Sequence, residues 1–342
     1  MVEAPESIKL LLPASMIQEI ESISMKERSI DDAVSAKWDQ KTKPIGSLGE
    51  LEDLVSWMAR CKGSDSLDKK LFHLTVFAGS HGIAKDGVSA YPSEVNAQMF
   101  ANFIAGGAAI NAICSTYGIH FQAVDCGIES PTQNFAEAAA MNHEEFVRAF
   151  KRGWEAVPSN SSLYAIGEMG IGNTTSATAL CAALLQQDPE SLVGRGTGIN
   201  ANQMQHKAKR IKQALELHHK YLNDPWERIR RLGGREIVSM CAAVLRASAS
   251  SIPIVLDGLI ATVAASIAFE IQPSSLAFCK SGHCSKEPAH LKLLKYYSLK
   301  PLLDFKMHLG EGSGAAMAMG VIQGALSCYQ NMATFESAGV SQ

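Results

Sequence analysis

Residues 161–185, SSLYAIGEMGIGNTTSATALCAALL, contain a short apolar run that ends in glycine, followed by a stretch with helical character. The same pattern returns in LFHLTVFAG (71–79), IHFQAVDCG (119–127), SIPIVLDG (251–258), SSLAFCKSGH (274–283) and PLLDFKMHLGEG (301–312). Continuous apolar strands that alternate with helices indicate a parallel sheet covered by helices on both faces. The sequence therefore predicts an α/β fold.

Polar residues gather where these apolar runs end. They include His81 after the first run, Glu168 after the third, Asp257, His283 and Glu311. In an open parallel sheet, ligands bind beyond the carboxyl ends of the strands. We therefore expect the functional site at that edge of the sheet.

Composition narrows the class of protein. The net charge of −3 lacks the basic excess of a nucleic-acid binder. The N-terminal sequence MVEAPESIKLLLPAS has an apolar run too short for a signal peptide, and the apolar stretch 252–269 is interrupted by Asp257 and Gly258. We expect a cytoplasmic protein whose eight cysteines, none in a CxxC pair, are reduced thiols in or near the core.

GEMGIGNTTSA (167–177) has the glycine spacing of a phosphate loop, but Asn173 stands where such a loop has lysine. A nucleoside triphosphate is therefore a poor ligand, whereas a monophosphate would suit the glycines and the helix N-terminus. The alternative is a tight turn that needs glycine for backbone reasons alone. Asn173, Thr174 and their neighbours add donors, which favours a functional turn.

A second glycine-rich turn, VGRGTGIN (193–200), precedes a probable helix with Lys207, Lys209, Arg210 and Lys212. The turn and one lysine would suit a ribose phosphate, although a lysine run is as often a solvated helix face. In LGEGSGAAMAM (309–319), Glu311 lies between glycines at the start of a helix, where it could equally be a capping group. To act as a base it needs an apolar pocket or a neighbouring carboxylate to raise its pKa.

Other motifs point away from alternative chemistry. Cys279, His283, Cys284 and His290 lack the regular ligand pairs of a structural zinc site. Ser80 lies outside any GxSxG elbow, so a serine hydrolase is not indicated. We expect neither a metal nor a cofactor. The long connection 78–100 is the kind of segment that often carries function, and we expect Ser80, Tyr91 and Gln98 to contribute to a base pocket.

Seven segments together resemble the nicotinate-nucleotide–dimethylbenzimidazole phosphoribosyltransferase family of cobalamin nucleotide-loop assembly. They are KPIGSLGELE (43–52), AGSHGIAKDGVSAYPSEVNAQM (78–99), GEMGIGNTTSATAL (167–180), VGRGTGIN (193–200), LDG (256–258), GHCSKEPAH (282–290) and LGEGSGAA (309–316). The resemblance implies a Rossmann-like sheet domain over 66–300 and a small helical domain formed by 1–65 and 301–342, in a homodimer. It also implies transfer of 5-phosphoribose from nicotinate mononucleotide to 5,6-dimethylbenzimidazole, which gives α-ribazole 5′-phosphate and nicotinate with inversion at the sugar.

The resemblance also assigns roles to residues. Glu311 is the expected general base and Glu168 the second acidic residue of the site. Apart from the resemblance, we expect Leu309 and Gly310 to help bind the acceptor base. The expected phosphate and ribose contacts are Gly170, Gly172, Asn173, Thr174, Gly194, Gly196, Gly198 and Lys207.

These residue types suit that reaction. The leaving base is already a pyridinium, so its departure needs no general acid, while the attacking benzimidazole must lose a proton to a carboxylate. Two other interpretations stay open: a catalytically silent paralogue that serves as a partner subunit, and a phosphoribosyltransferase for another acceptor base. A dinucleotide-binding oxidoreductase is disfavoured, because Thr175 replaces the third glycine of the fingerprint.

Overall fold

The computed structural model describes residues 8–25, 29–68, 70–196 and 198–341. Its six strands form one parallel sheet in the order β2-β1-β3-β4-β5-β6. The strands are β1 (Phe72–Ala78), β2 (His120–Asp125), β3 (Leu163–Met169), β4 (Ile254–Leu256), β5 (Cys279–His283) and β6 (Pro301–Leu303). Each strand falls within one of the six apolar runs, which confirms the predicted α/β class.

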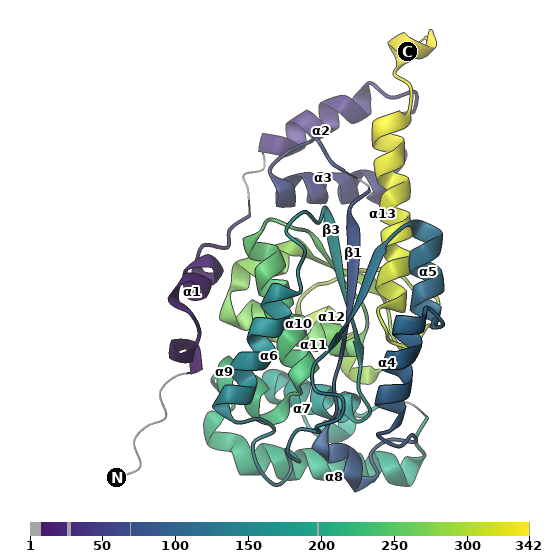
Figure 1. Cartoon of the computed structure of the whole chain (residues 1–342). Helices are drawn as coiled ribbons and strands as arrows, with labels where there is room; N and C mark the ends of the chain where they lie inside the picture. The colour runs from purple at the N-terminus through teal and green to yellow at the C-terminus, as the bar shows by residue number, and fades with distance from the viewer. Residues whose placement is uncertain (1–7, 26–28, 69, 197, 342) are drawn as a thin grey trace.

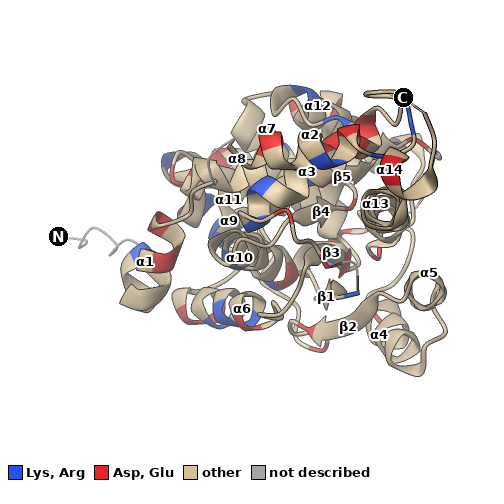
Figure 2. Cartoon of the chain, turned by 90° about the horizontal axis from the view of Figure 1, so that it is seen from above, with Lys and Arg blue, Asp and Glu red and all other residues tan. Residues whose placement is uncertain are grey.

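Helices cover both faces of the sheet (Figures 1 and 2). On one face lie α6 (His143–Glu155), α10 (Arg235–Ala249) and α11 (Leu259–Ile271); on the other lie α4 (Val95–Ala105), α5 (Ala109–Tyr117) and α13 (Ser313–Asn331). The remaining longer helices are α1 (Ala14–Glu21), α2 (Ser29–Asp39), α3 (Glu50–Lys62), α7 (Asn173–Leu185), α8 (Ala201–His218), α9 (Pro225–Leu232) and α12 (Pro288–Tyr296). A short helix, α14 (Phe335–Ala338), follows α13.

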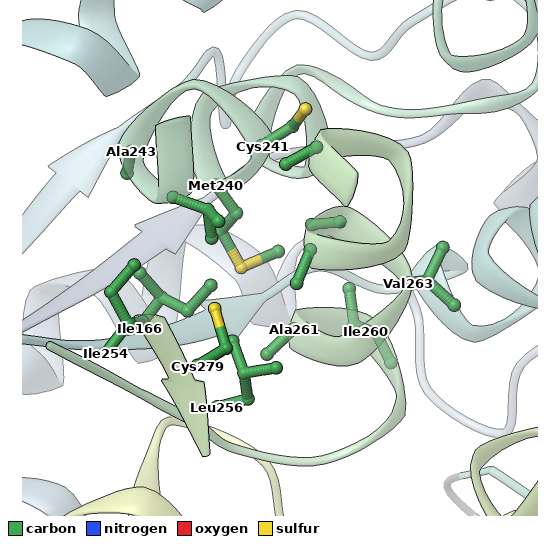
Figure 3. Packing of buried hydrophobic residues seen from close by; sticks show 14 of the residues in the cluster. Ile166, Met240, Cys241, Ala243, Ile254, Leu256, Ile260, Ala261, Val263 and Cys279 are labelled. Carbon is green, nitrogen blue, oxygen red and sulfur yellow. The ribbon is translucent and has the colours of Figure 1, made fainter. Parts of the chain in front are cut away.

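Apolar side chains of different sizes fill the core between the helices and the sheet. Figure 3 shows Met240 of α10 above Ile166 of β3 and Leu256 of β4, with Ala261 of α11 alongside; all four are buried. At Gly153 on α6, an added Cβ would overlap the Ser239 carbonyl of α10, so this helix pair requires glycine at the crossing. The eight cysteines are free thiols and six of them are buried, as the sequence predicts.

Strand register brings the polar strand ends together. Phe77 pairs with Glu168 and Ala78 with Met169, and the Gly79 N–H then donates to the Met169 carbonyl at 2.9 Å. β3 also pairs with β4 up to Leu256, the residue before Asp257. Because all six strands are parallel, these ends form one continuous edge.

The segment around α2 and α3 meets the C-terminal end of α13 beyond the opposite edge of the sheet (Figure 1), where the Thr42 N–H donates to the Ala333 carbonyl at 3.1 Å and α3 packs on α13. A small unit made of 1–65 and 301–342 stays a prediction, since α13 also packs along the sheet and β6, inside the second range, is its edge strand. In the described part of the chain one stretch, Val95–Tyr117, is long and apolar enough to cross a membrane by length and composition. The structure divides that stretch into α4 and α5.

Candidate active site

A cavity of about 430 Å³ lies at the carboxyl edge of the sheet. Its walls come from the ends of β3, β4 and β5, from α4, and from the segments that precede α7 and α13. Of the residues predicted for the site, those that line this cavity are Tyr91, Glu168, Gly170, Asn173, Thr174, Gly196, Leu309, Gly310 and Glu311. The strand-end rule therefore located the cavity, and the two predicted carboxylates share one wall region.

Glu311 lies between Gly310 and Gly312, immediately before α13. All three residues have positive φ, at 89° for Gly310, 62° for Glu311 and 78° for Gly312. The Glu311 side chain is 6% exposed, and its Oε2 has no hydrogen-bond partner among the described residues. Burial, and then the nearby charge of Asp257, raises the pKa of the Glu311 carboxyl above its usual value. A carboxylate in this state is suited to take a proton near neutral pH.

Asp257 fixes the segment that carries Glu311. It follows β4, and its carboxylate accepts backbone N–H groups of Gly312 at 3.2 Å, Gly314 at 2.8 Å and Ala315 at 3.0 Å. Asp257 therefore caps α13 from another strand, where a negative charge is favoured by the helix dipole. The sequence placed Asp257 at a strand end but gave no sign of this capping role.

Glu168, at the end of β3, faces the same cavity. Burial raises the pKa of the Glu168 carboxyl to about 8, with the charges of Asp257, Glu236 and Glu311 adding to the rise and a hydrogen bond from Asn173 opposing it. Glu168 therefore carries a proton at pH 7. A Cβ at Gly310 would overlap Glu168 Oε1, so glycine at position 310 is what lets this side chain reach the Glu311 segment.

The predicted phosphate residues gather around the start of α7. Lys207 on α8 is fully buried, and its Nζ donates to Thr174 Oγ1 at 2.8 Å. Burial lowers the pKa of Lys207 to about 8, and the charge of Glu287 opposes that shift. The Gly196 N–H donates to Glu287 Oε1 at 2.9 Å. Thr174 and Gly196 thus line one corner of the cavity, and Lys207, which does not line it, lies behind this corner and contacts it through Thr174 Oγ1.

Lys207 is the lysine of α8 that reaches this corner. Lys209 is exposed, and Lys212 forms ion pairs with Asp188 at 3.3 Å and Glu190 at 2.6 Å. Gly172 does not line the cavity. Its φ is 97°, and a Cβ at this position would lie 3.3 Å from the Cβ of His81, so the turn before α7 requires glycine here. Gly194 and Gly198 also lie outside the cavity lining.

The predicted base residues divide into two groups. Tyr91 and Leu309 line the cavity and are 55% and 57% exposed, as expected of residues at its mouth. Ser80 and Gln98 do not line it: Ser80 is buried and Gln98 is exposed on α4. Their contact with a base stays a prediction that this arrangement does not support.

Several lining residues escaped the sequence analysis, among them Val95, Met99, Ser285, Glu287 and His308. Val95 and Met99 belong to α4, which begins inside the segment interpreted as a long connection. Their i, i+4 spacing puts both on one helix face, a signal that could have found them.

Three histidines had no predicted role. His290 is buried: its Nδ1 accepts from the Ser285 N–H at 3.1 Å, and its Nε2 lies 3.1 Å from Thr262 Oγ1. Burial lowers the pKa of His290 to about 3, so it is a neutral core residue. His81 is hydrogen-bonded to Glu236, both fully buried, and His283 Nε2 lies 3.5 Å from Asp257 Oδ1. Among the described residues no group of three or more His, Cys, Asp or Glu side chains could hold a metal ion.

Comparison with known proteins gives the class first. The model of a phosphoribosyltransferase family matches residues 23–340, and the chain belongs to that family. Similar curated proteins are named nicotinate-nucleotide–dimethylbenzimidazole phosphoribosyltransferase: one from Brucella canis is 44% identical over 300 residues, 88% of each chain. Another from Cereibacter sphaeroides is 42% identical over 321 residues, 94% of this chain and 95% of the relative.

A solved structure gives the same result. The crystal structure of CobT from Thermus thermophilus superposes with a TM-score of 0.85 at 36% identity and covers 92% of this chain and 99% of that one. The family resemblance and the fold predicted from the sequence are therefore confirmed.

Proposed function

We propose that this protein transfers 5-phosphoribose from nicotinate mononucleotide to 5,6-dimethylbenzimidazole, giving α-ribazole 5′-phosphate and nicotinate. The observation that carries the proposal is the buried Oε2 of Glu311, which has no partner among the described residues and belongs to a cavity wall. Thr174 and Gly196 line the same cavity and would suit a phosphate. The names of the relatives supply the two substrates. The alternatives of a silent paralogue and of another acceptor base gain no support from this geometry.

The corner formed by Thr174, Gly196 and Lys207 would hold the 5′-phosphate. It offers the Thr174 hydroxyl beside the N-terminus of α7, where partial positive charge favours anions, with the buried Lys207 ammonium behind that hydroxyl. The Gly196 N–H donates to Glu287 Oε1 in this structure and would exchange that carboxylate for the phosphate. Phosphate binding would raise the pKa of the buried Lys207 by supplying it with a counter-charge.

Glu311 would serve the acceptor. Its ionised carboxylate accepts the N–H of the benzimidazole, and the other ring nitrogen attacks the anomeric carbon as the pyridinium nitrogen leaves with its bonding electrons. The proton passes to Glu311, so the benzimidazole ring of the product carries no positive charge, and the sugar keeps its 5′-phosphate. Attack from the face opposite the leaving base inverts the anomeric centre, and holding both rings in place supplies much of the acceleration.

Glu168 would hold a proton at neutral pH, so that the neighbouring Glu311 can be ionised. Two neighbouring carboxyl groups resist holding two negative charges, so one retains its proton. Because burial raises the pKa of Glu168 to about 8, we propose that Glu168 holds the proton and that Glu311 acts as the ionised base. Glu168 can then donate a hydrogen bond into the cavity.

A direct assay tests the proposal. Purified protein is incubated with nicotinate mononucleotide and dimethylbenzimidazole, and the products are separated by chromatography; equal amounts of nicotinate and α-ribazole 5′-phosphate are expected. Parallel reactions with purines and phenols test the choice of acceptor. Absence of turnover in folded protein that binds the nucleotide would favour the silent-paralogue interpretation.

We also propose that the protein is a cytoplasmic homodimer that pairs through α4 and α5. Val95–Tyr117 contains no charged residue, as the uncoloured helices in Figure 2 illustrate, and Ile104 on α4 is 68% exposed. An exposed helix pair without charged residues favours a covering partner. A second copy would cover it.

Sedimentation tests the assembly. The wild type should sediment as a dimer, and Ala101→Glu, on the exposed face of α4, should give a monomer, whereas Ala338→Glu on the C-terminal helix should not. A monomeric wild type would contradict the proposal, and so would binding of the helical hairpin formed by α4 and α5 to lipid vesicles.

A further inference from the structure

Asn96 is a buried polar residue in a helix that otherwise presents apolar side chains to the cavity. It lies on α4 between Val95 and Met99, which both line the cavity, and it has no exposed surface. A polar side chain in this position is retained only if its hydrogen bonds are made. Asn96 makes them to two elements outside its own helix.

The first bond joins α4 to the nucleotide turn. Asn96 Oδ1 accepts the backbone N–H of Ile171 at 2.8 Å, and Ile171 lies between Gly170 and Gly172 in the turn that starts α7. The second bond joins α4 to the end of β1: Asn96 Nδ2 donates to Ser80 Oγ at 2.8 Å, and the Ser80 hydroxyl in turn donates to the Ile128 carbonyl.

The backbone N–H of Ile171 and the backbone carbonyl of Ile128 fix which group donates in each of these three hydrogen bonds. An N–H stands at one end of the series and a carbonyl at the other, so the side chain between them must accept on one side and donate on the other. An amide does both, while leucine of similar size does neither and leaves the Ile171 N–H and the Ser80 hydroxyl unpaired in the interior. An ionised aspartate would lack the proton that Ser80 receives.

We propose that Asn96 is a positioning residue for the transfer reaction, which holds the helix lining the acceptor pocket in register with the turn that holds the nucleotide. The proposal rests on the proposed function of the site. Val95 and Met99 belong to α4, whereas Glu168 and the turn around Ile171 belong to β3 and the start of α7. The hydrogen bond from the Ile171 N–H to Asn96 therefore sets the distance between the attacking base and the nucleotide. Asn96 itself has no exposed atom with which to contact a ligand.

The two halves of the site should therefore weaken together when this bond is lost. Displacements of about 1 Å at a reacting pair lower rates by about a hundred-fold. For Asn96→Leu we expect kcat/KM to fall at least about ten-fold, with KM raised for both substrates. Asn96→Ala leaves room for a water that could accept from the Ile171 N–H, and we expect a smaller change of the same kind.

Asn111→Ala is the matched control. Asn111 lies in the same helical hairpin, where its Oδ1 accepts from the Ala108 N–H at 3.1 Å and its Nδ2 donates to the Phe103 carbonyl at 3.0 Å, away from the cavity lining. This variant should lower Tm while leaving both KM values within two-fold. A purely structural role for Asn96 would give the same result for Asn96→Leu and would overturn the proposal, as would a rise in only one KM.

Substrate identity is separated from this test by two further measurements. Turnover by the wild type decides the proposed function on its own. Affinity for inorganic phosphate, measured by calorimetry, should fall in Asn96→Leu and not in Asn111→Ala, whichever base is the acceptor. Should Asn96→Leu fail to fold, Asn96→Ala is measured in its place. Unchanged phosphate affinity in the folded Asn96 variant means that the turn does not depend on Asn96, and the inference then fails even if the wild type is active.

Discussion

Replacing Glu311 with glutamine separates proton removal from every other contribution of this side chain. The glutamine side chain has nearly the same shape and stays neutral, so a buried charge disappears while the packing is kept. Because Oε2 has no partner among the described residues, no internal hydrogen bond is broken by the change. We therefore expect Tm to stay equal or to rise.

The kinetic cost follows from the role of the carboxylate. General-base assistance contributes about 10²–10⁴ in rate, so kcat for Glu311→Gln should fall by that factor, about 3–5 kcal/mol of activation free energy. KM for nicotinate mononucleotide should stay unchanged, because the phosphate corner at Thr174, Gly196 and Lys207 belongs to other elements.

The pH profile adds an independent reading. A base is active only when ionised, so wild-type kcat/KM should fall with decreasing pH through the pKa of Glu311. Since burial and Asp257 raise that pKa, the acid limb should lie above the usual glutamate range, which centres at about 4.3. The limb should be absent from the residual activity of Glu311→Gln.

The assay is initial-rate product formation over a range of substrate concentrations from pH 5 to 9, which gives both kcat and kcat/KM, with nucleotide affinity measured by calorimetry. Glu216→Gln, an exposed glutamate on α8, serves as the control for loss of a carboxylate and should behave as wild type. If Glu311→Gln kept kcat within ten-fold of wild type, with native Tm and affinity, Glu311 would not be the base.

Three further changes test the surrounding residues. Glu168→Gln keeps a neutral donor, so activity at pH 7 should survive within about ten-fold, whereas the alkaline loss expected in wild type near the Glu168 pKa of about 8 should vanish; a persisting alkaline limb would argue against a protonated Glu168. Asp257→Asn should destabilise by about 1–2 kcal/mol through the lost cap and lower the pKa of Glu311, which thermal denaturation and a shifted acid limb would show. Lys207→Met should raise KM for the nucleotide alone, and the exposed Lys209→Met should not; equal effects would move the phosphate away from Lys207.

Much of the site followed from local sequence. Glu168 lies at the carboxyl end of β3, where the sequence placed it. Glu311 does not follow a strand directly, since β6 ends at Leu303, and it reaches the same cavity because Asp257 of the β4 end holds the start of α13. The role of Lys207 came only from the family resemblance, since nothing in its helix distinguishes it from Lys209 until α8 is placed against α7. Burial and the bond to Thr174 make that distinction.

The rest depends on contacts between distant segments. Asp257 caps a helix that starts more than fifty residues later, and the sheet order that brings β4 beside that helix is not written in either segment alone. Asn96 was missed because α4 begins in a stretch whose glycine, proline and serine content is typical of a loop. A polar residue between two apolar ones becomes informative only once its burial is known.

The backbone conformation at Glu311 supports the proposal that this glutamate serves the reaction. Non-glycine residues in the left-handed region cost about 1 kcal/mol or more, and both neighbours of Glu311 that share this conformation are glycines. Glycine at 311 would adopt the same turn without that cost and would remove a buried, unpartnered oxygen as well. Stability alone therefore favours glycine, and the three N–H bonds to Asp257 hold the turn whichever residue occupies the position. What glycine would not provide is a carboxylate of raised pKa in the cavity wall, which is the group that the proposed reaction needs to take the benzimidazole proton.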